Sequence, residues 1–280
     1  MAKRSKKRKT IKRRRKLKKF KVKESQKELI IKTKSDWIKK GLVNKKEYEK
    51  KYNDSIKNND SFWKKEGKRI TWIKPYKKIK EVKYSKSEVT IKWYEDGTLN
   101  ASANCIDRHL KNKKDKTAII WVGDDPKIQK KITYKQLLQE VSKTANGLKE
   151  IGVKKGDRVT IYLTMIPELA FTMLACARIG AVHSIIFGGF SSDSIAGRIN
   201  DCKSDYVVTA DQGIRGGKTI ELKATVDEAL INCPNVKKCI VVKRTGNFIH
   251  WDNDRDVWYH DITKKASSHC EPEEMNAEDP

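Results

Sequence analysis

The sequence of 280 residues lacks any long apolar run. A membrane-spanning helix needs about 18 or more consecutive apolar residues. The stretch that comes nearest, from Ile161 to Phe187, is divided by Pro167, Glu168, Arg178 and His183. The N-terminal residues also lack the apolar core of about 7 to 15 residues that a secretory signal peptide requires. We therefore expect neither a membrane span nor a secretory signal.

Paired cysteines and metal-ligand spacings are absent as well. The six cysteines include no C-x-x-C pair, and the closest two, Cys233 and Cys239, are six positions apart, which favours reduced thiols and a cytoplasmic protein. The five histidines include no i, i+4 pair, and the acids beside His250 match no ligand spacing, so we expect no metal site. His183 lies in an apolar stretch and is interpreted as a core histidine. No catalytic triad is readable.

Acidic residues are missing from the first twenty positions, where 13 residues are Lys or Arg. Since the whole chain carries a formal net charge of +27, about half of this excess belongs to that segment. Like charges and a shortage of apolar residues predict that residues 1–34 form a disordered basic tail. Residues 1–20 would then contact RNA, DNA or an anionic membrane, because each neutralised phosphate releases counterions. The alternatives are an incidental extension without function and a start codon placed upstream of the true one.

The chain is predicted to divide into three zones. After the tail, residues 35–94 place aromatic side chains in a charged background, with Tyr48, Tyr52 and Ile56 at four-residue spacing on one helix face. This zone is interpreted as a helical segment that packs onto the main domain. Residues 95–280 then alternate strand and helix patterns and form the third zone.

The alternation in the third zone predicts the fold class. Strand, helix, strand at these intervals implies parallel pairing with right-handed crossovers. We therefore predict an α/β fold, a doubly wound and mainly parallel sheet. Strands are expected at 118–122, 158–163, 181–187, 206–210 and 239–242, and helices from the N-cap Thr133 to Leu148, from Pro167 to near Gly180 and over 191–200; residues 258–263 close the readable pattern.

Two glycine-rich turns follow predicted strands, and we name them the FGG turn (187–189) and the RGGK turn (215–218). Glycine lets backbone approach a ligand without interference from a Cβ atom. Arg can hold a phosphate through two hydrogen bonds, and Lys adds a point charge. Because ligands collect at the carboxyl ends of parallel strands, these turns predict a site for a phosphorylated ligand. The residues singled out are Phe187, Gly188, Gly189, Arg215, Gly216, Gly217 and Lys218.

Longer stretches of the sequence resemble one family. They are FWKKEGKRITWIKPY (62–76), WYEDGTLNASANCIDRHL (93–110), ITYKQLL (132–138) and the segment 180–218 that contains both turns. From about Tyr48 to its last residue, the chain resembles the N-terminal part of AMP-forming acetyl-coenzyme A synthetases (acetate–CoA ligases). These enzymes belong to the adenylate-forming acyl-CoA synthetase superfamily.

The resemblance implies a function and roles for the two turns. Members of the family form acetyl-AMP and pyrophosphate from acetate and ATP, with magnesium, and then transfer the acetyl group to coenzyme A with release of AMP. The resemblance implies that the RGGK turn contacts a phosphate of coenzyme A and that the FGG turn lies beside its adenine. The family often has Arg where this chain has Lys218, so the charge is kept and the bidentate geometry is lost.

The resemblance also implies which parts of such an enzyme are missing. The family's phosphate-binding loop is expected just after Pro280, and the acetate pocket, the magnesium site and the mobile C-terminal domain come later. We therefore expect no catalytic residue in this chain and no acetyl-AMP formation by the chain alone. Two alternatives are a ligase fragment for propionate or another short acid, and a nucleic-acid-binding protein that acts through its basic tail.

Overall fold

The computed structural model describes residues 30–280. The prediction of a disordered basic tail falls mainly on residues 1–29 and so lies outside the described part. The chain divides into two compact units, the first ending at Asp54 and the second comprising Ser55–Pro280. No helix within the described residues is both long enough and apolar enough to cross a bilayer.

The described part of the first unit is helical. Helix α1 (Ser35–Lys40) is followed by α2 (Lys45–Lys57), which continues into the second unit. The rings of Tyr48 and Tyr52 stack along α2 with their centroids 6.1 Å apart. The helix predicted from the four-residue spacing is therefore confirmed, and its packing onto the main domain stays a prediction.

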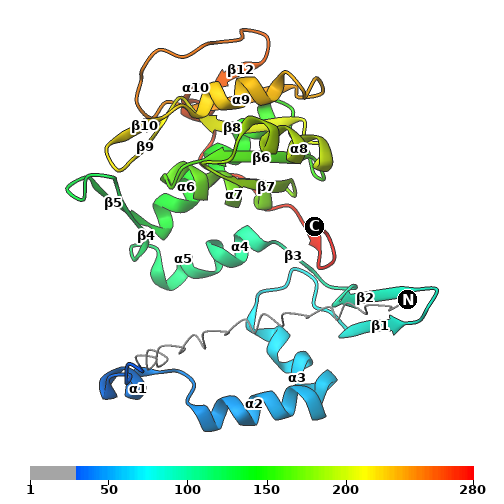
Figure 1. Ribbon diagram of the computed structural model, residues 1–280. Helices are drawn as coiled ribbons and strands as arrows, with labels where there is room; N and C mark the ends of the chain where they lie inside the picture. Colours follow the sequence, from blue (N-terminus) through cyan, green and yellow to red (C-terminus); the bar gives the residue numbers. More distant parts are fainter. Residues whose placement is uncertain (1–29) are drawn as a thin grey trace, which may run out of the picture. The chain divides into compact units, whose positions relative to one another are not determined.

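A five-stranded sheet forms the centre of the second unit (Figure 1). Its strands are β6 (Arg158–Leu163), β7 (Val182–Phe187), β8 (Tyr206–Ala210), β11 (Lys238–Val242) and β12 (Asp256–Trp258). Their spatial order is β12-β11-β8-β6-β7, and every neighbouring pair is parallel. The chain places β7 on one side of β6 and then places β8 on the other side of β6. The direction in which strands are added therefore reverses between β6 and β8, and this position is a topological switch point. The predicted doubly wound fold is confirmed.

Helices cover the sheet in two groups. Helix α6 packs against α7 and α10, whereas α8 packs against α9. Right-handed crossovers that run in opposite directions place their helices on opposite faces, so α7 and α8 flank the sheet from its two sides. All five residues of the central strand β8 are buried between these layers. The helices are α6 (Tyr134–Glu150), α7 (Pro167–Arg178), α8 (Ser192–Cys202), α9 (Leu222–Leu230) and α10 (Tyr259–Lys264).

Local sequence signals fix where these helices begin. Thr133 caps α6: its hydroxyl accepts the N–H of Gln136 at 3.2 Å, while the Gln136 side chain accepts the N–H of Thr133 at 2.9 Å. This reciprocal pair is a capping box. Pro167 occupies the first turn of α7, where its missing N–H costs nothing. Ser191 caps α8. All three predicted starts are confirmed.

One predicted pairing is wrong. Strand β4 (Thr117–Val122) was expected to join the parallel pattern, but it pairs antiparallel with β5 (Gln129–Thr133) and lies outside the five-stranded sheet. The link between these strands is a short turn, and a parallel crossover needs about a dozen residues or more. Residues 258–263, which close the predicted pattern, belong to two elements: strand β12 ends at Trp258, and helix α10 begins at Tyr259.

Smaller elements complete the second unit. Buried Asn100 joins segments distant in sequence, since its side-chain amide donates to the carbonyl oxygens of Ala177 and Glu273, both at 2.9 Å. The remaining elements are α3 (Asn59–Glu66), the 3₁₀ helix η1 (Gly67–Arg69), α4 (Ala101–Cys105) and α5 (Asp107–Lys113), with three antiparallel pairs: β1 (Lys80–Tyr84) with β2 (Val89–Trp93), β3 (Thr98–Leu99) with β13 (Met275–Asn276), and β9 (Gly213–Arg215) with β10 (Lys218–Ile220).

Candidate functional site

A pocket of about 460 Å³ lies at the carboxyl ends of β6 and β7, beside the switch point. Its walls come from the end of β4, the ends of β6 and β7, the β9–β10 hairpin and the loop after β11. Most of the lining is apolar, and Arg215 and Arg244 are its two cationic residues. The lining residues are Trp121, Val122, Gly123, Asp124, Leu163, Thr164, Met165, Ile166, Leu169, Ile185, Ile186, Phe187, Gly188, Ile214, Arg215, Ile220 and Arg244.

The FGG turn contributes two of its three residues to this pocket. Phe187 ends β7 and is 63% exposed. Gly188 lies so close to β6 that an added Cβ would sit 3.1 Å from the carbonyl oxygen of Leu163. Gly189 does not line the pocket; its N–H donates to the carbonyl oxygen of Phe187 at 2.7 Å. Close backbone approach therefore accounts for the first glycine of the turn.

The RGGK turn is the tip of the β9–β10 hairpin. Gly216 and Gly217 have φ values of +58° and +71°, a left-handed conformation that glycine adopts without strain. Arg215 and Lys218 pair across the hairpin, and both side chains are exposed. Within residues 30–280 neither cation forms an ion pair. Arg215 lines the pocket, whereas Lys218 lies outside its lining.

Sequence reasoning missed a second cationic group in the pocket. The guanidinium of Arg244 lies 5.2 Å from the ring centroid of Trp121, a cation–π distance. The indole N–H of Trp121 donates to the carbonyl oxygen of Met165 at 2.7 Å, which fixes the ring. Arg244 lies two positions after the end of buried strand β11, so a cation in a loop that follows a strand, the signal that identified the RGGK turn, was present there too. Trp121 carried no such signal, because it lies within a strand and not in a loop that follows one.

A buried carboxylate fixes the loop that carries Arg244. Asp211, which follows β8, is fully buried. Its oxygens accept the backbone N–H groups of Gln212 at 2.6 Å, Arg244 at 2.8 Å and Gly246 at 2.7 Å. A carboxylate that accepts several backbone N–H bonds forms strong, charge-assisted contacts. The ends of β8 and β11 are therefore held together at the edge of the pocket.

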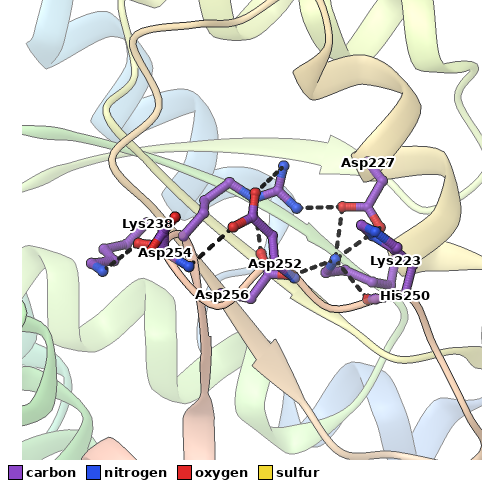
Figure 2. A network of polar contacts seen from close by, with 8 residues as sticks. Lys223, Asp227, Lys238, His250, Asp252, Asp254 and Asp256 are labelled. Atoms are coloured by element: carbon purple, nitrogen blue, oxygen red, sulfur yellow. Dashed lines mark hydrogen bonds and ion pairs between the residues drawn. The ribbon is translucent and has the colours of Figure 1, made fainter.

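A network of ion pairs fixes the helix that follows the hairpin (Figure 2). The ammonium group of Lys223 in α9 is fully buried and lies 2.7 Å from Asp227 and 2.8 Å from Asp256. Arg255 binds the same two carboxylates at 2.6 Å and 2.8 Å. Burial alone would raise the pKa of Asp256, but hydrogen bonds from Arg255, from the N–H of Asp252 and from Lys223 hold this pKa below its ordinary value. The charges of the network compensate one another.

The described residues offer few groups for other chemistry. Residues 30–280 include no group of three or more His, Cys, Asp or Glu side chains placed to bind a metal ion. All six cysteines are free. Burial raises the pKa of Cys176 and of Cys239 to about 12, so both thiols stay protonated near neutral pH. Burial lowers the pKa of His183, whose imidazole is therefore neutral near pH 7.

The architecture defines the class of protein. An open, doubly wound sheet with a pocket at the carboxyl ends of its strands belongs to the ligand-binding α/β proteins. Residues 106–280 match the family model described as AMP-binding enzyme, and residues 48–105 match the one described as acetyl-coenzyme A synthetase N-terminus. The chain belongs to the AMP-binding enzyme family. The resemblance noted from the sequence is thereby confirmed.

Curated relatives and a solved structure agree with this assignment. The chain is 59% identical over 246 residues to the acetyl-coenzyme A synthetase of Parvibaculum lavamentivorans, covering 88% of this chain and 38% of the relative. It is 55% identical to that of Mesorhizobium japonicum, covering 87% and 38%. The fold is similar to acetoacetyl-CoA synthetase from Streptomyces lividans, with a TM-score of 0.72 and 24% identity over 81% of this chain and 34% of that one. The chain thus spans little more than a third of the length of its relatives.

Proposed function

We propose that this chain is the N-terminal part of an AMP-forming acetate–CoA ligase. The names of the relatives support this proposal, because identities of 55–59% extend over most of the chain. In the complete enzyme, a carboxylate oxygen of acetate attacks the α-phosphorus of ATP, and pyrophosphate leaves. Acetyl-AMP results. Magnesium, when bound, would offset the negative charge of the phosphates. The thiol of coenzyme A then loses its proton and attacks the acetyl carbonyl, and AMP leaves.

Within this chain, the proposed role is to bind the nucleotide end of coenzyme A. The observation that carries this role is that Arg215 of the RGGK turn and the exposed Phe187 line one pocket, with a second exposed cation, Lys218, paired with Arg215 across the hairpin. Arg215 and Lys218 are proposed to offer charge to the 3′-phosphate of coenzyme A, the phosphate at its nucleotide end. Phe187 and the glycine backbone of the FGG turn offer a flat surface to the adenine. The assigned residues are Phe187, Gly188, Gly189, Arg215, Gly216, Gly217 and Lys218.

Calorimetric titration tests the proposed binding site. The chain is titrated with coenzyme A and with 3′-dephospho-coenzyme A, and the affinities are compared. Arg215→Ala is expected to lower the affinity for coenzyme A by about 1.5–3 kcal/mol, the usual contribution of a charge-assisted hydrogen bond. It should also reduce the preference for the 3′-phosphate. Lys154→Ala is the matched control, since Lys154 is exposed before β6 at the opposite edge of the sheet. Equal binding of both ligands by the unmodified chain would refute the assignment.

We further propose that the chain alone forms no acetyl-AMP, because it spans only 38% of the length of its relatives. Acetate-dependent exchange of labelled pyrophosphate into ATP measures this step directly. The expected result is no exchange above a blank without protein, while a complete acetyl-coenzyme A synthetase assayed in parallel gives exchange. Measurable exchange by the purified chain would contradict the proposal.

Three further assignments belong to the same proposal. The divisions near residues 34 and 94 separate the basic tail, the N-terminal segment and the nucleotide-binding part. The protein acts in the cytoplasm, which the six free cysteines support. Residues 1–20 contact nucleic acid non-specifically through their 13 basic side chains.

A further inference from the structure

The carboxylate of Asp124 joins two hairpins that are far apart in the sequence. Its Oδ1 accepts the backbone N–H of Gly216 at 2.7 Å, and its Oδ2 accepts that of Gly217 at 2.8 Å. Gly216 and Gly217 lie 92 and 93 positions after Asp124 in the sequence. Each carboxylate oxygen therefore holds one glycine of the RGGK turn.

The geometry of the turn explains why a carboxylate binds there. Positive φ values at both central residues are typical of a type I′ turn, which matches the twist of a hairpin. Successive N–H groups in turns of this kind form a concavity that binds anions. In this chain a protein carboxylate fills the concavity. A phosphate that approaches the turn therefore meets the side chains of Arg215 and Lys218, not the glycine amides.

Asp124 itself is held by a well-bonded turn between β4 and β5. The N–H of Gly123 donates to the carbonyl oxygen of Ile128 at 2.8 Å, and the N–H of Ile128 donates to the carbonyl oxygen of Asp125 at 2.9 Å. The Asp125 carboxylate accepts the N–H of Lys127 at 2.9 Å. Strands β9 and β10, in contrast, have three residues each and pair only with one another within the described residues. The tip of their hairpin is thus held from the β4–β5 side.

We infer that Asp124 is a positioning residue for the phosphate contact: it holds the RGGK turn so that Arg215 stays at the wall of the pocket. The inference rests on the proposed coenzyme A site. Asp124 and Arg215 both line the same pocket, which places the two ends of this link beside the ligand. A carboxylate this close to an anion site also repels the ligand, so positioning and repulsion predict opposite effects on affinity when Asp124 is replaced.

Three variants separate these effects. Asp124→Ala removes both hydrogen bonds, whereas Asp124→Asn keeps one carbonyl acceptor and removes the charge. Asp125→Asn is the matched control in the same turn, because its side-chain oxygen still accepts the N–H of Lys127. Hydrogen exchange of the Gly216 and Gly217 amides, measured by NMR on the full chain, reports how firmly the turn is held. Calorimetry with coenzyme A and with 3′-dephospho-coenzyme A reports the phosphate contact.

Positioning predicts faster exchange at both glycines in Asp124→Ala and an affinity for coenzyme A reduced by about tenfold, the loss expected for one charge-assisted hydrogen bond. Asp124→Asn should lie between that variant and the unmodified chain, and Asp125→Asn should match the unmodified chain. An unchanged or higher affinity in Asp124→Ala overturns the inference while leaving the site intact. If the unmodified chain shows no preference for the 3′-phosphate, the proposed function fails and the inference fails with it.

Discussion

Lys223 is a fully buried lysine whose charge is offset by its neighbours. Moving an ammonium ion out of water costs several kcal/mol, and this cost is recovered only when partners are close and well oriented. Asp227 and Asp256 supply such partners at 2.7 Å and 2.8 Å, and Arg255 balances the second negative charge. The network is therefore sensitive to the loss of any one member.

Asp256→Asn is expected to lower the free energy of unfolding by about 3 kcal/mol at pH 7, because it leaves the buried Lys223 undercompensated. The native pKa of Asp256 lies below its ordinary value of 3.8, so the carboxylate stabilises the fold above that value. This contribution is lost as pH falls through the native pKa. Urea unfolding is measured from pH 7 down to pH 3 for the unmodified chain and for Asp256→Asn. The difference between their free energies of unfolding should become smaller at the acid end.

Asp254→Asn is the matched control for this experiment. Asp254 lies in the loop just before β12, is exposed, and its carboxylate forms no ion pair within residues 30–280. Its replacement should change the free energy of unfolding by less than about 0.5 kcal/mol. If both variants unfold at the same urea concentration as the original chain, the buried network does not stabilise the fold.

At the scale of elements, α6 is packed tightly against the segment around α10. Gly147 of α6 faces the backbone of Ile262, and a Cβ added at Gly147 would lie 2.6 Å from the carbonyl oxygen of Ile262. Gly197 in α8 has no atom within 4 Å of such a Cβ. The two helical glycines therefore differ in packing and not in backbone conformation.

Gly197→Ala is expected to raise the free energy of unfolding by about 0.5–1 kcal/mol, since alanine is the better helix former. Gly147→Ala gains the same propensity but forces α6 and α10 apart, at a cost of about 1–3 kcal/mol. It should therefore be destabilising overall. Thermal and urea unfolding of both variants measure the difference, and an equal stabilisation by the two substitutions would contradict the close packing of α6 on α10.

Element starts and the central sheet were predictable because their causes are local in sequence. Thr133, Pro167 and Ser191 act on the turn that they begin, and an apolar run such as residues 206–210 marks a strand buried on both faces. The partner of a strand is not encoded in this way. The pairing of β4 was mispredicted because its apolar run, residues 118–122, fits a strand of a hairpin as well as a strand of the main sheet.

The candidate site was predictable only in part for the same reason. Glycines and cations after predicted strands identified the two turns, and Phe187, Gly188 and Arg215 do meet at one pocket. The interactions of Trp121 with Arg244 and of Asp124 with the glycine amides join hairpins and loops about a hundred residues apart. Nothing in the local sequence of either partner specifies such an interaction.

At the scale of the whole molecule, positive charge is unevenly distributed. The first twenty residues carry 13 of the positive charges and no negative one, within a formal net charge of +27. In a polyanion-binding protein, the logarithm of affinity falls linearly with the logarithm of salt concentration, and the slope reports how many phosphates are neutralised. The charge of the tail is therefore measurable as a salt slope.

Deletion of residues 1–20 is expected to weaken binding to single-stranded RNA by at least about tenfold at low salt. It should also reduce the magnitude of the salt slope by about 0.7 for each phosphate that the shortened chain no longer neutralises. Fluorescence anisotropy with a labelled oligonucleotide, titrated at several salt concentrations, measures both quantities. A chain in which residues 1–20 are shuffled should bind as the original does. Undiminished binding by the truncated chain would assign RNA binding to the remaining lysines.

The link between Asp124 and the glycine turn also has a consequence in time. A ribosome adds about 5–20 residues per second, and the N-terminal parts of a chain begin to fold first. Because 93 positions separate Asp124 from Gly217, roughly 5–20 s pass between the synthesis of Asp124 and that of Gly217. During that interval the β4–β5 hairpin exposes its pocket side to the cell, and a chaperone that protects nascent chains would have this surface available.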